Sequence, residues 1–356
     1  MVLSRMEHIL HRTLIIRFSS VGDIVLSSLL TRTLRRRFPD CQIDYLVKEE
    51  YADLVRHNPH LSRVIVFPSG GTFRDLRRMR AAIRHTRYDL LIDIHDSLRS
   101  RFLCFGSSTT VRIRKRKIAR FVLLKFGRDI YPWFGGTPSV ALRYLEPLAA
   151  YGIHDDGEGL EVAVPPALEE AGVSRLRNAG IPAHAMVIGI SPSARHATKI
   201  WPADRYGAVA ASLARDFGAA ILLFGGPGEE ELCRRVEQRI HTDAPAAQVV
   251  NTAGTLTLLE TAAVMDRCSL ILSNDSGLMH IAAARKRRVV ALFGSTTRHF
   301  GFFPFGSASE VVEHPALTCR PCTHIGLPAC PKGHFKCMEE LTSEQVLAAA
   351  RRLLAA

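Results

Sequence analysis

The strongest constraint on this chain is an alternation of strand and helix patterns that occurs twice. Short apolar runs rich in β-branched residues predict strands in the first half at residues 13–18, 41–47, 64–67 and 90–94. After an acidic stretch with Gly and Pro at 152–166, similar runs follow at residues 186–190, 220–224, 270–272 and 289–293. Strands that alternate with helices predict parallel sheets covered on both faces. We therefore expect an α/β protein of two Rossmann-like α/β/α domains, residues 1–160 and 161–356.

Positive charge is concentrated in the first of these halves. Residues 1–160 hold 27 Lys and Arg against 16 Asp and Glu, out of a net charge of +13 for the chain. Such a surface attracts phosphate-rich partners, which include nucleic acid, an anionic membrane surface and a phosphorylated lipid. No apolar run reaches the roughly 18 residues of a membrane span, and the first residues lack the apolar core of a signal peptide. The expected location is the cytoplasm, with mostly reduced cysteines.

Polar residues follow the first predicted strand, where ligands bind in open parallel sheets. Ser19, Ser20, Gly22 and Asp23 form this turn, and Asp23 falls at the start of the next predicted helix. Its carboxylate can act as a general base, or it can simply complement the helix dipole.

A second candidate turn lies in the other half, after the predicted strand at 270–272. Backbone N–H groups of Ser276 and Gly277 open a helix there and can bind a diphosphate. Asp275 and His280 can contact the same ligand, or can serve as a helix cap and a packed core residue.

Two further turns supply polar groups in the second half. Ser193, Arg195 and Lys199 follow the strand at 186–190, and Lys199 can neutralise a departing diphosphate or remain a surface lysine. Glu229 follows the strand at 220–224 and can bind a ribose hydroxyl or stand as a helix N-terminal acid. The surrounding GGPGE segment is not a G-x-G-x-x-G fingerprint, which disfavours a nicotinamide-dependent oxidoreductase.

Four cysteines gather in the segment 319–337, with a C-x2-C-x7-C-x6-C spacing. They are Cys319, Cys322, Cys330 and Cys337, with His324 and His334 between them. A metal knuckle and a redox disulfide are both compatible with this cluster. The spacing is irregular for zinc, so we expect a reduced structural loop without metal.

Several segments together resemble the lipopolysaccharide heptosyltransferases of glycosyltransferase family 9. They are LIIRFSSVGDIVLSSLL near the start, KIWPADRY in the middle, SNDSGLMHIAAA and VALFGST later, and the cysteine-rich CRPCTHIGLPACPKGHFKCM. They span nearly the whole chain in the order of the family. Each alone would be a weak signal, but their combination is specific.

The resemblance implies a GT-B architecture, whose two domains face each other across a cleft. It implies inverting, metal-independent heptose transfer from ADP-heptose to the lipopolysaccharide inner core, with no cofactor besides the nucleotide sugar. Asp23 corresponds to the general base, and Ser19, Ser20 and Gly22 lie in the implied acceptor-binding turn. The implied donor-binding residues are Ser193, Lys199, Glu229, Asp275, Ser276, Gly277 and His280.

The implied partners are a nucleotide-sugar donor, an anionic lipopolysaccharide precursor and the inner face of the cytoplasmic membrane. The enzyme would be cytoplasmic and peripheral to that membrane, where the basic first half suits an acidic acceptor. One alternative is a related glycosyltransferase that uses another nucleotide sugar for surface polysaccharide. A non-enzymatic nucleic-acid-binding protein is the other, but aromatic residues are only 7% and scattered, so no nucleic acid partner is expected.

Overall fold

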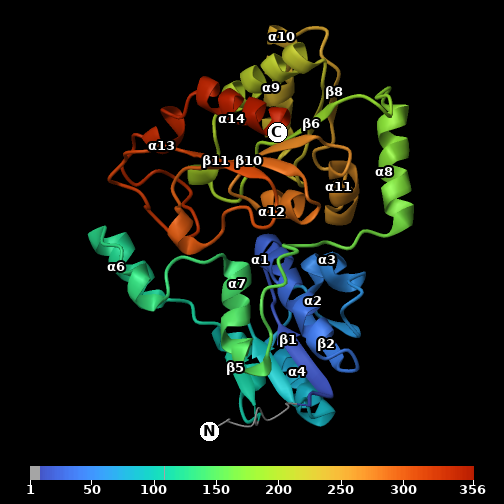
Figure 1. Ribbon diagram of the computed structural model, residues 1–356, viewed down its shortest axis with the longest axis vertical. Coiled ribbons are helices and arrows are strands. Elements are labelled where there is room, and N and C mark those ends of the chain that lie inside the picture. The colour runs from blue at the N-terminus through green and yellow to red at the C-terminus, as the bar shows by residue number, and fades with distance from the viewer. Residues whose placement is uncertain (1–8, 108) are drawn as a thin grey trace. The chain divides into compact units, whose positions relative to one another are not determined.

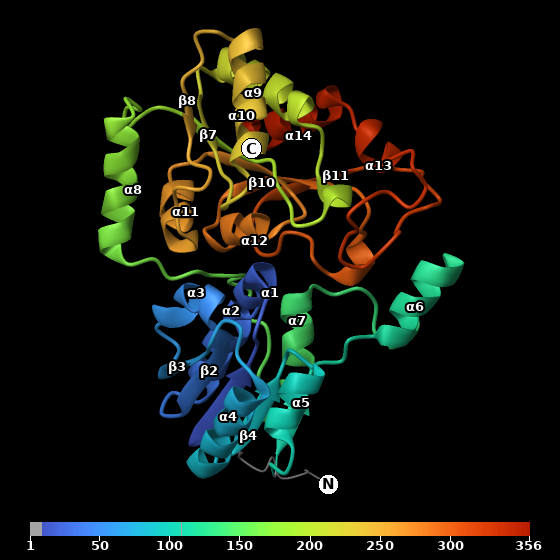
Figure 2. The ribbon, with the colours of Figure 1, turned by 180° about the vertical axis from the view of Figure 1, so that it is seen from behind.

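The computed structural model describes residues 9–107 and 109–356, and the chain divides into two compact units (Figures 1 and 2). Unit 1 comprises Met1–Lys115 and Val140–Glu158, and unit 2 comprises Arg116–Ser139 and Gly159–Ala356. Each unit is built on its own parallel sheet, so the predicted α/β class with two Rossmann-like halves is confirmed.

Unit 1 contains a five-stranded parallel sheet in the order β3-β2-β1-β4-β5. Its strands are β1 (Arg12–Ile16), β2 (Gln42–Lys48), β3 (Arg63–Phe67), β4 (Leu90–Asp93) and β5 (Thr110–Arg112). Its α-helices are α1 (Val21–Leu26), α2 (Ser28–Arg37), α3 (Asp53–Arg56), α4 (Phe73–Thr86), α5 (Leu98–Cys104) and α7 (Val140–Leu145). The strand order reverses direction between β1 and β4, and ligands of such sheets bind beyond the carboxyl ends of the two strands at this switch point.

Unit 2 contains a six-stranded parallel sheet in the order β11-β10-β9-β6-β7-β8. Its strands are β6 (Val187–Ser191), β7 (Ala220–Leu223), β8 (Val249–Asn251), β9 (Leu270–Asn274), β10 (Arg288–Phe293) and β11 (Ser309–Glu313). This is the strand order of a complete Rossmann fold, and its switch point lies between β6 and β9.

Helices cover both faces of the unit 2 sheet. The α-helices of unit 2 are α6 (Lys117–Phe126), α8 (Pro166–Asn178), α9 (Ala203–Phe217), α10 (Glu230–Asp243), α11 (Leu258–Met265), α12 (Gly277–Ala284), α13 (Lys336–Glu339) and α14 (Ser343–Ala355). Figure 1 shows α9, α10 and α14 on one face of the sheet and α11 and α12 on the other. All of β6 and β9 is buried as a result, which explains their continuous apolar runs.

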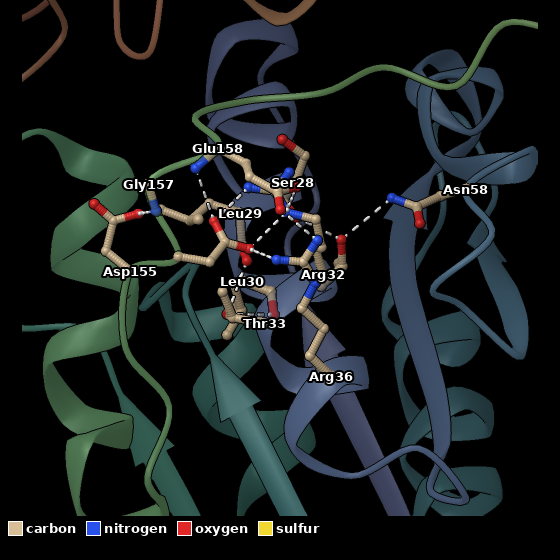
Figure 3. A network of polar contacts seen from close by, with 12 residues as sticks. Ser28, Leu29, Leu30, Arg32, Thr33, Arg36, Asn58, Asp155, Gly157 and Glu158 are labelled. Atoms are coloured by element: carbon tan, nitrogen blue, oxygen red, sulfur yellow. Dashed lines mark hydrogen bonds and ion pairs between the residues drawn. The ribbon is translucent and has the colours of Figure 1, made fainter.

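The segment that returns to unit 1, Val140–Glu158, is joined to α2 by a network of ion pairs (Figure 3). Arg32 places Nε and Nη2 at 2.8 and 2.9 Å from the two carboxylate oxygens of Asp156. Arg36 pairs with the same carboxylate at 2.8 Å and with Glu158 at 2.7 Å. The hydrogen bond from Arg32 lowers the pKa of Asp156 to about 2, so the pair remains charged at neutral pH. The buried Arg32 guanidinium thus keeps this distant segment on unit 1.

The predicted division of the chain at residue 160 needs a correction, because the units are not contiguous in sequence. The second crossing lies near the expected place, between Glu158 and Gly159, but residues 116–139 leave the first half and belong to unit 2. The apolar side chains of Ala119 and Leu123 in α6 pack with Tyr131 and Phe300. This small core joins α6 to the second unit.

No helix in the described ranges combines the length and apolar character needed to cross a bilayer.

Candidate active site

The turn after β1 brings together the four predicted residues of the first half. Ser20 precedes α1 as its N-cap, and Gly22 and Asp23 lie in the first turn of the helix. Ser20 donates two hydrogen bonds to Asp23 Oδ2, from its backbone N at 3.3 Å and its Oγ at 3.0 Å. Ser19 also lies in this turn, where its carbonyl accepts a 2.6 Å hydrogen bond from Arg17 Nε. The predicted cluster therefore exists as one local structure at the carboxyl end of β1.

Asp23 is more than a helix cap, because two residues not predicted from the sequence contact its carboxylate. Arg17 Nη2 lies 2.5 Å from Oδ2, and the Tyr144 hydroxyl donates to Oδ1 at 3.2 Å. Burial raises the pKa of Asp23, but the Arg17 charge and the Ser20 hydrogen bonds outweigh it and hold the pKa below its usual range. The carboxylate is therefore ionised, oriented and able to accept a proton from a bound hydroxyl.

The neighbouring strand of the switch point adds His95 and a second cation. Lys115 Nζ donates to the carbonyl of His95 at 2.5 Å and to that of Asp96 at 2.9 Å. Burial lowers the pKa of His95 to about 3, with further contributions from the charges of Arg17 and Lys115. The ring is therefore neutral near pH 7. No motif in the sequence marks His95, since its proximity to Asp23 arises only from the pairing of β1 with β4.

In unit 2, the predicted residues Lys199 and Asp275 form an ion pair although 76 positions separate them. Lys199 Nζ lies 2.7 Å from Asp275 Oδ2, and the Thr296 hydroxyl donates to the same oxygen at 2.7 Å. Lys199 follows β6 and Asp275 follows β9, the two strands at the switch point. Both side chains are largely buried, so their charges are only weakly screened.

Asn274 joins the two loops that carry this ion pair. Its Nδ2 donates to the carbonyl of Pro192 at 2.7 Å, and its Oδ1 accepts from the backbone N of Trp201 at 3.2 Å. Trp201 is itself fully buried and donates through Nε1 to the carbonyl of Leu341 at 2.9 Å. The loop that carries Lys199 is thereby fixed at both sides.

Ser193 and Glu229, also predicted, contact each other at 2.5 Å through Oγ and Oε2. Glu229 Oε2 accepts a second hydrogen bond from the backbone N of Gly226 at 2.6 Å. Glu229 is the N-cap of α10, which begins at Glu230. The carboxylate of Glu229 therefore faces the loop after β7 and the loop after β6.

The remaining predicted residues lie at the start of α12. Ser276 is its N-cap and Gly277 is its first residue. The hydroxyl oxygens of Ser273 and Ser276 are 3.3 Å apart. His280 lies in the first turn but is buried, with its ring 6.3 Å from that of Phe302. The N-terminus of this helix presents backbone N–H groups close to the Lys199 and Asp275 pair, an arrangement suited to a bound phosphate.

The cysteine-rich segment contains free thiols. Cys319, Cys322 and Cys330 are half-buried and Cys337 is buried, and none of the eight cysteines forms a disulfide. Cys319 Sγ lies 3.8 Å from His334 Nε2. Across the described part of the chain, no three His, Cys, Asp or Glu side chains come together as a ready metal site.

Comparison with known proteins shows similarity to one family over both units. Residues 76–330 match the model of a family described as glycosyltransferase family 9 (heptosyltransferase). The chain is 27% identical to lipopolysaccharide heptosyltransferase 2 of Escherichia coli K12, with 96% of this chain and 98% of that protein covered. It is 28% identical to lipooligosaccharide heptosyltransferase 2 of Haemophilus influenzae, with 81% and 84% covered.

Solved structures show the same fold over the whole chain. The glycosyl transferase family 9 protein of Veillonella parvula superposes with a TM-score of 0.79 at 22% identity, covering 100% of this chain and 99% of that one. ADP-heptose lps heptosyltransferase II of E. coli gives a TM-score of 0.72 at 24% identity, with 97% and 98% covered. The predicted GT-B fold is thereby confirmed.

Proposed function

Because the chain belongs to glycosyltransferase family 9, we propose that it transfers heptose from ADP-heptose to the inner core of lipopolysaccharide. The chain is a glycosyltransferase, and the proposal concerns its donor and acceptor. The observation that carries it is the match to heptosyltransferase 2 of E. coli, which extends over 96% of this chain and 98% of that protein. Both units, and not one nucleotide-binding unit alone, share this similarity.

In the proposed reaction, an acceptor hydroxyl oxygen attacks the anomeric carbon of the heptose. The new C–O bond forms as the bond to the ADP oxygen breaks, which inverts the anomeric centre. Asp23 accepts the hydroxyl proton, and ADP leaves with the bonding electron pair. The proton becomes more acidic as the bond forms, so a carboxylate of lowered pKa suffices as the base. Arg17 and Tyr144 hold that carboxylate in one orientation.

The departing diphosphate requires positive charge and N–H donors. We assign this role to Lys199 and to the backbone of Ser276 and Gly277, without a metal ion or further cofactor. Asp275 orients Lys199 through their 2.7 Å ion pair. Glu229, held by Ser193, is placed to accept a ribose hydroxyl, and His280 supports the start of α12.

The proposed acceptor is an anionic lipopolysaccharide precursor carried in the cytoplasmic membrane, and the enzyme would work at the inner face of that membrane as a peripheral protein. Two cations at this end of the sheet, Arg17 beside Asp23 and Lys115 beside His95, favour an acidic acceptor. Ser19, Ser20 and Gly22 form the turn at which this acceptor would bind. No role for nucleic acid is proposed.

Calorimetry with ADP, UDP, GDP and NAD, in buffer without divalent metal, tests the donor assignment first. Selective ADP binding, followed by heptose transfer from ADP-heptose to Kdo-lipid A or a heptosylated acceptor, is the expected result. Preference for UDP or GDP would retain the glycosyltransferase and replace the heptose donor. An ADP affinity that appears only with a divalent metal would overturn the metal-independent assignment.

A further inference from the structure

A group of large apolar side chains in residues 116–139 is exposed to solvent. Among the exposed large hydrophobic residues of the described chain, five lie here: Ile118, Phe121, Phe126, Trp133 and Phe134. Trp133 is 82% exposed, and Phe121 and Phe126 are 60% and 62% exposed. Singly scattered apolar residues are normal on protein surfaces, whereas five exposed large apolar residues within one short segment indicate an interaction site. We call these five residues the α6 surface.

The exposed face of α6 is distinct from the face that packs inward. Ala119 and Leu123 are four positions apart and are buried against Tyr131 and Phe300. Ile118, Phe121 and Lys125 follow helical spacing on another side of the same helix and are exposed. The exposed side of α6 is therefore a second face of the helix, separate from the buried one, and it carries both apolar and basic side chains.

Basic residues surround the α6 surface. The segment 116–139 holds five Lys and Arg, namely Arg116, Lys117, Arg120, Lys125 and Arg128, against the single acid Asp129. Asp129 is engaged within unit 2, since its Oδ1 accepts from the backbone N of Tyr131 at 2.9 Å and its Oδ2 lies 3.2 Å from His299 Nε2. Arg120, Lys125 and Arg128 form no ion pair with any described acid. Aromatic side chains thus lie in the same segment as the positive charges of Arg120, Lys125 and Arg128, which no described acid balances.

The aromatic residues are held in place rather than carried on a free tail. Trp133 and Phe134 belong to a short 3-10 helix, Tyr131–Phe134, whose first residue is buried. The centroid of the Tyr131 ring lies 5.7 Å from that of the His299 ring. The Phe121 and Phe126 rings meet edge to face, with their centroids 6.1 Å apart. Figures 1 and 2 show α6 projecting from the edge of unit 2. Little backbone ordering is therefore needed before these groups bind a partner.

We propose that the α6 surface docks unit 2 on an anionic phospholipid bilayer, with the phenylalanines and Trp133 entering the headgroup region and the basic residues contacting lipid phosphates. Helices with Lys and Arg beside Phe, Leu and Trp bind membranes in this interfacial manner, and Trp favours the depth of the headgroups. The inference rests on the proposed function, because an acceptor embedded in a membrane requires the enzyme to reach that membrane.

The two tryptophans of the chain make a direct test possible. Trp133 is exposed and Trp201 is fully buried, so a change of emission on docking reports Trp133. Vesicles of phosphatidylethanolamine and phosphatidylglycerol should shift the emission to the blue and protect it from acrylamide, and phosphatidylcholine vesicles should do so much less. Trp133→Phe should lose the shift while the protein still sediments with the anionic vesicles.

Two variants separate the apolar and the charged contributions. Phe121→Gln with Phe126→Gln should lower vesicle partitioning by at least about tenfold, because both rings lose their apolar burial. Lys125→Gln with Arg128→Gln should lower it by about thirtyfold at low salt, and salt should reduce that difference. Phe217→Gln and Arg177→Gln, on exposed positions of α9 and α8, are the matched controls and should bind as the wild type does.

The proposal is overturned if the wild-type protein does not bind the anionic vesicles, or if the paired phenylalanine variant partitions into them as strongly as the wild type. A Trp133 shift with single-stranded RNA and none with vesicles would replace the membrane by a nucleic acid. ADP calorimetry and transfer to a deacylated, water-soluble acceptor are measured in parallel. Transfer without vesicle binding would contradict only the docking proposal, and vesicle binding without transfer would contradict only the proposed function.

Discussion

Asp23, the proposed general base, also has a structural role, because the Arg17 guanidinium beside it is buried. Removal of the Asp23 carboxylate would leave the Arg17 charge buried and unpaired, which is strongly destabilising. The same contact holds the pKa of Asp23 below its usual range. The proposed general base is therefore kept ionised at the expense of some basicity.

Asp23→Asn should retain the shape of the side chain and remove its charge. We expect turnover to fall by about 10²- to 10⁴-fold, since the proton acceptor is lost. The free energy of unfolding should fall by about 3–5 kcal/mol, since Arg17 is left without its carboxylate. Steady-state kinetics and denaturant unfolding measure the two effects, with the exposed Asp53→Asn of the same unit as control. Near-wild-type turnover would remove Asp23 from the mechanism.

Lys199→Met should weaken ADP binding by about 10- to 100-fold, because the variant loses a cation and leaves the Asp275 carboxylate uncompensated beside the diphosphate. Adding Asp275→Asn should recover part of the affinity by removing that repulsion. Calorimetry of both variants measures the effect, and the exposed Lys336→Met is the control. Unchanged ADP affinity in Lys199→Met would contradict the diphosphate role.

At the scale of elements, the sequence predicts those parts of the fold in which burial produces a clear pattern. The pattern of apolar residues in the second half also predicts helices at residues 203–217 and at about 277–284, and α9 and α12 have these bounds. The central strands of both sheets lie within a few residues of their expected positions, because buried strands appear as continuous apolar runs. The short strands β5, β8 and β11 were not predicted, since they lie at sheet edges, are only half-buried and lack such runs.

Packing between helices is also invisible in the sequence, and Gly207 of α9 illustrates this. A Cβ there would lie 2.4 Å from Cβ of Arg239 and 3.0 Å from the carbonyl oxygen of Val236, both in α10. Helix propensity alone predicts that Gly207→Ala stabilises the protein by about 1 kcal/mol. The clash predicts a net loss of about 1–3 kcal/mol instead.

Gly172 in α8 provides the matched substitution. Its added Cβ would lie 3.4 Å from the nearest atom, the carbonyl carbon of Ala263, which is an ordinary contact. Gly172→Ala should therefore stabilise unit 2 by up to about 1 kcal/mol. Urea unfolding followed by the emission of the buried Trp201 measures both variants. Equal signs for the two substitutions would contradict this account of the α9 and α10 packing.

At the scale of the whole molecule, the sequence predicts the two halves but not the path between them. Nothing in residues 116–139 indicates which core will accept Ala119 and Leu123, because their partner Phe300 lies far along the chain. The same limit applies to the candidate site. The sequence predicts each polar turn separately. The hydrogen bonds from Tyr144 to Asp23 and from Thr296 to Asp275 instead join residues that are distant in the sequence. Local chemistry can be predicted from sequence, and its long-range partners cannot.

The proposed division of roles between the units predicts where ADP will protect the backbone from hydrogen exchange. Residues 191–199 and 273–280, at the switch point of unit 2, should exchange more slowly with ADP, and residues 17–26 of unit 1 should not. At an ADP concentration of 100 times the dissociation constant, binding raises the free energy of opening of the unit that binds ADP by about 2.7 kcal/mol. Exchange through this opening then slows about 100-fold. Mass spectrometry of peptides measures this, with Lys199→Met at the same ADP concentration as control. Protection at residues 17–26 without protection at 191–199 would move the nucleotide to unit 1, and would require the roles of Asp23 and Lys199 to be exchanged.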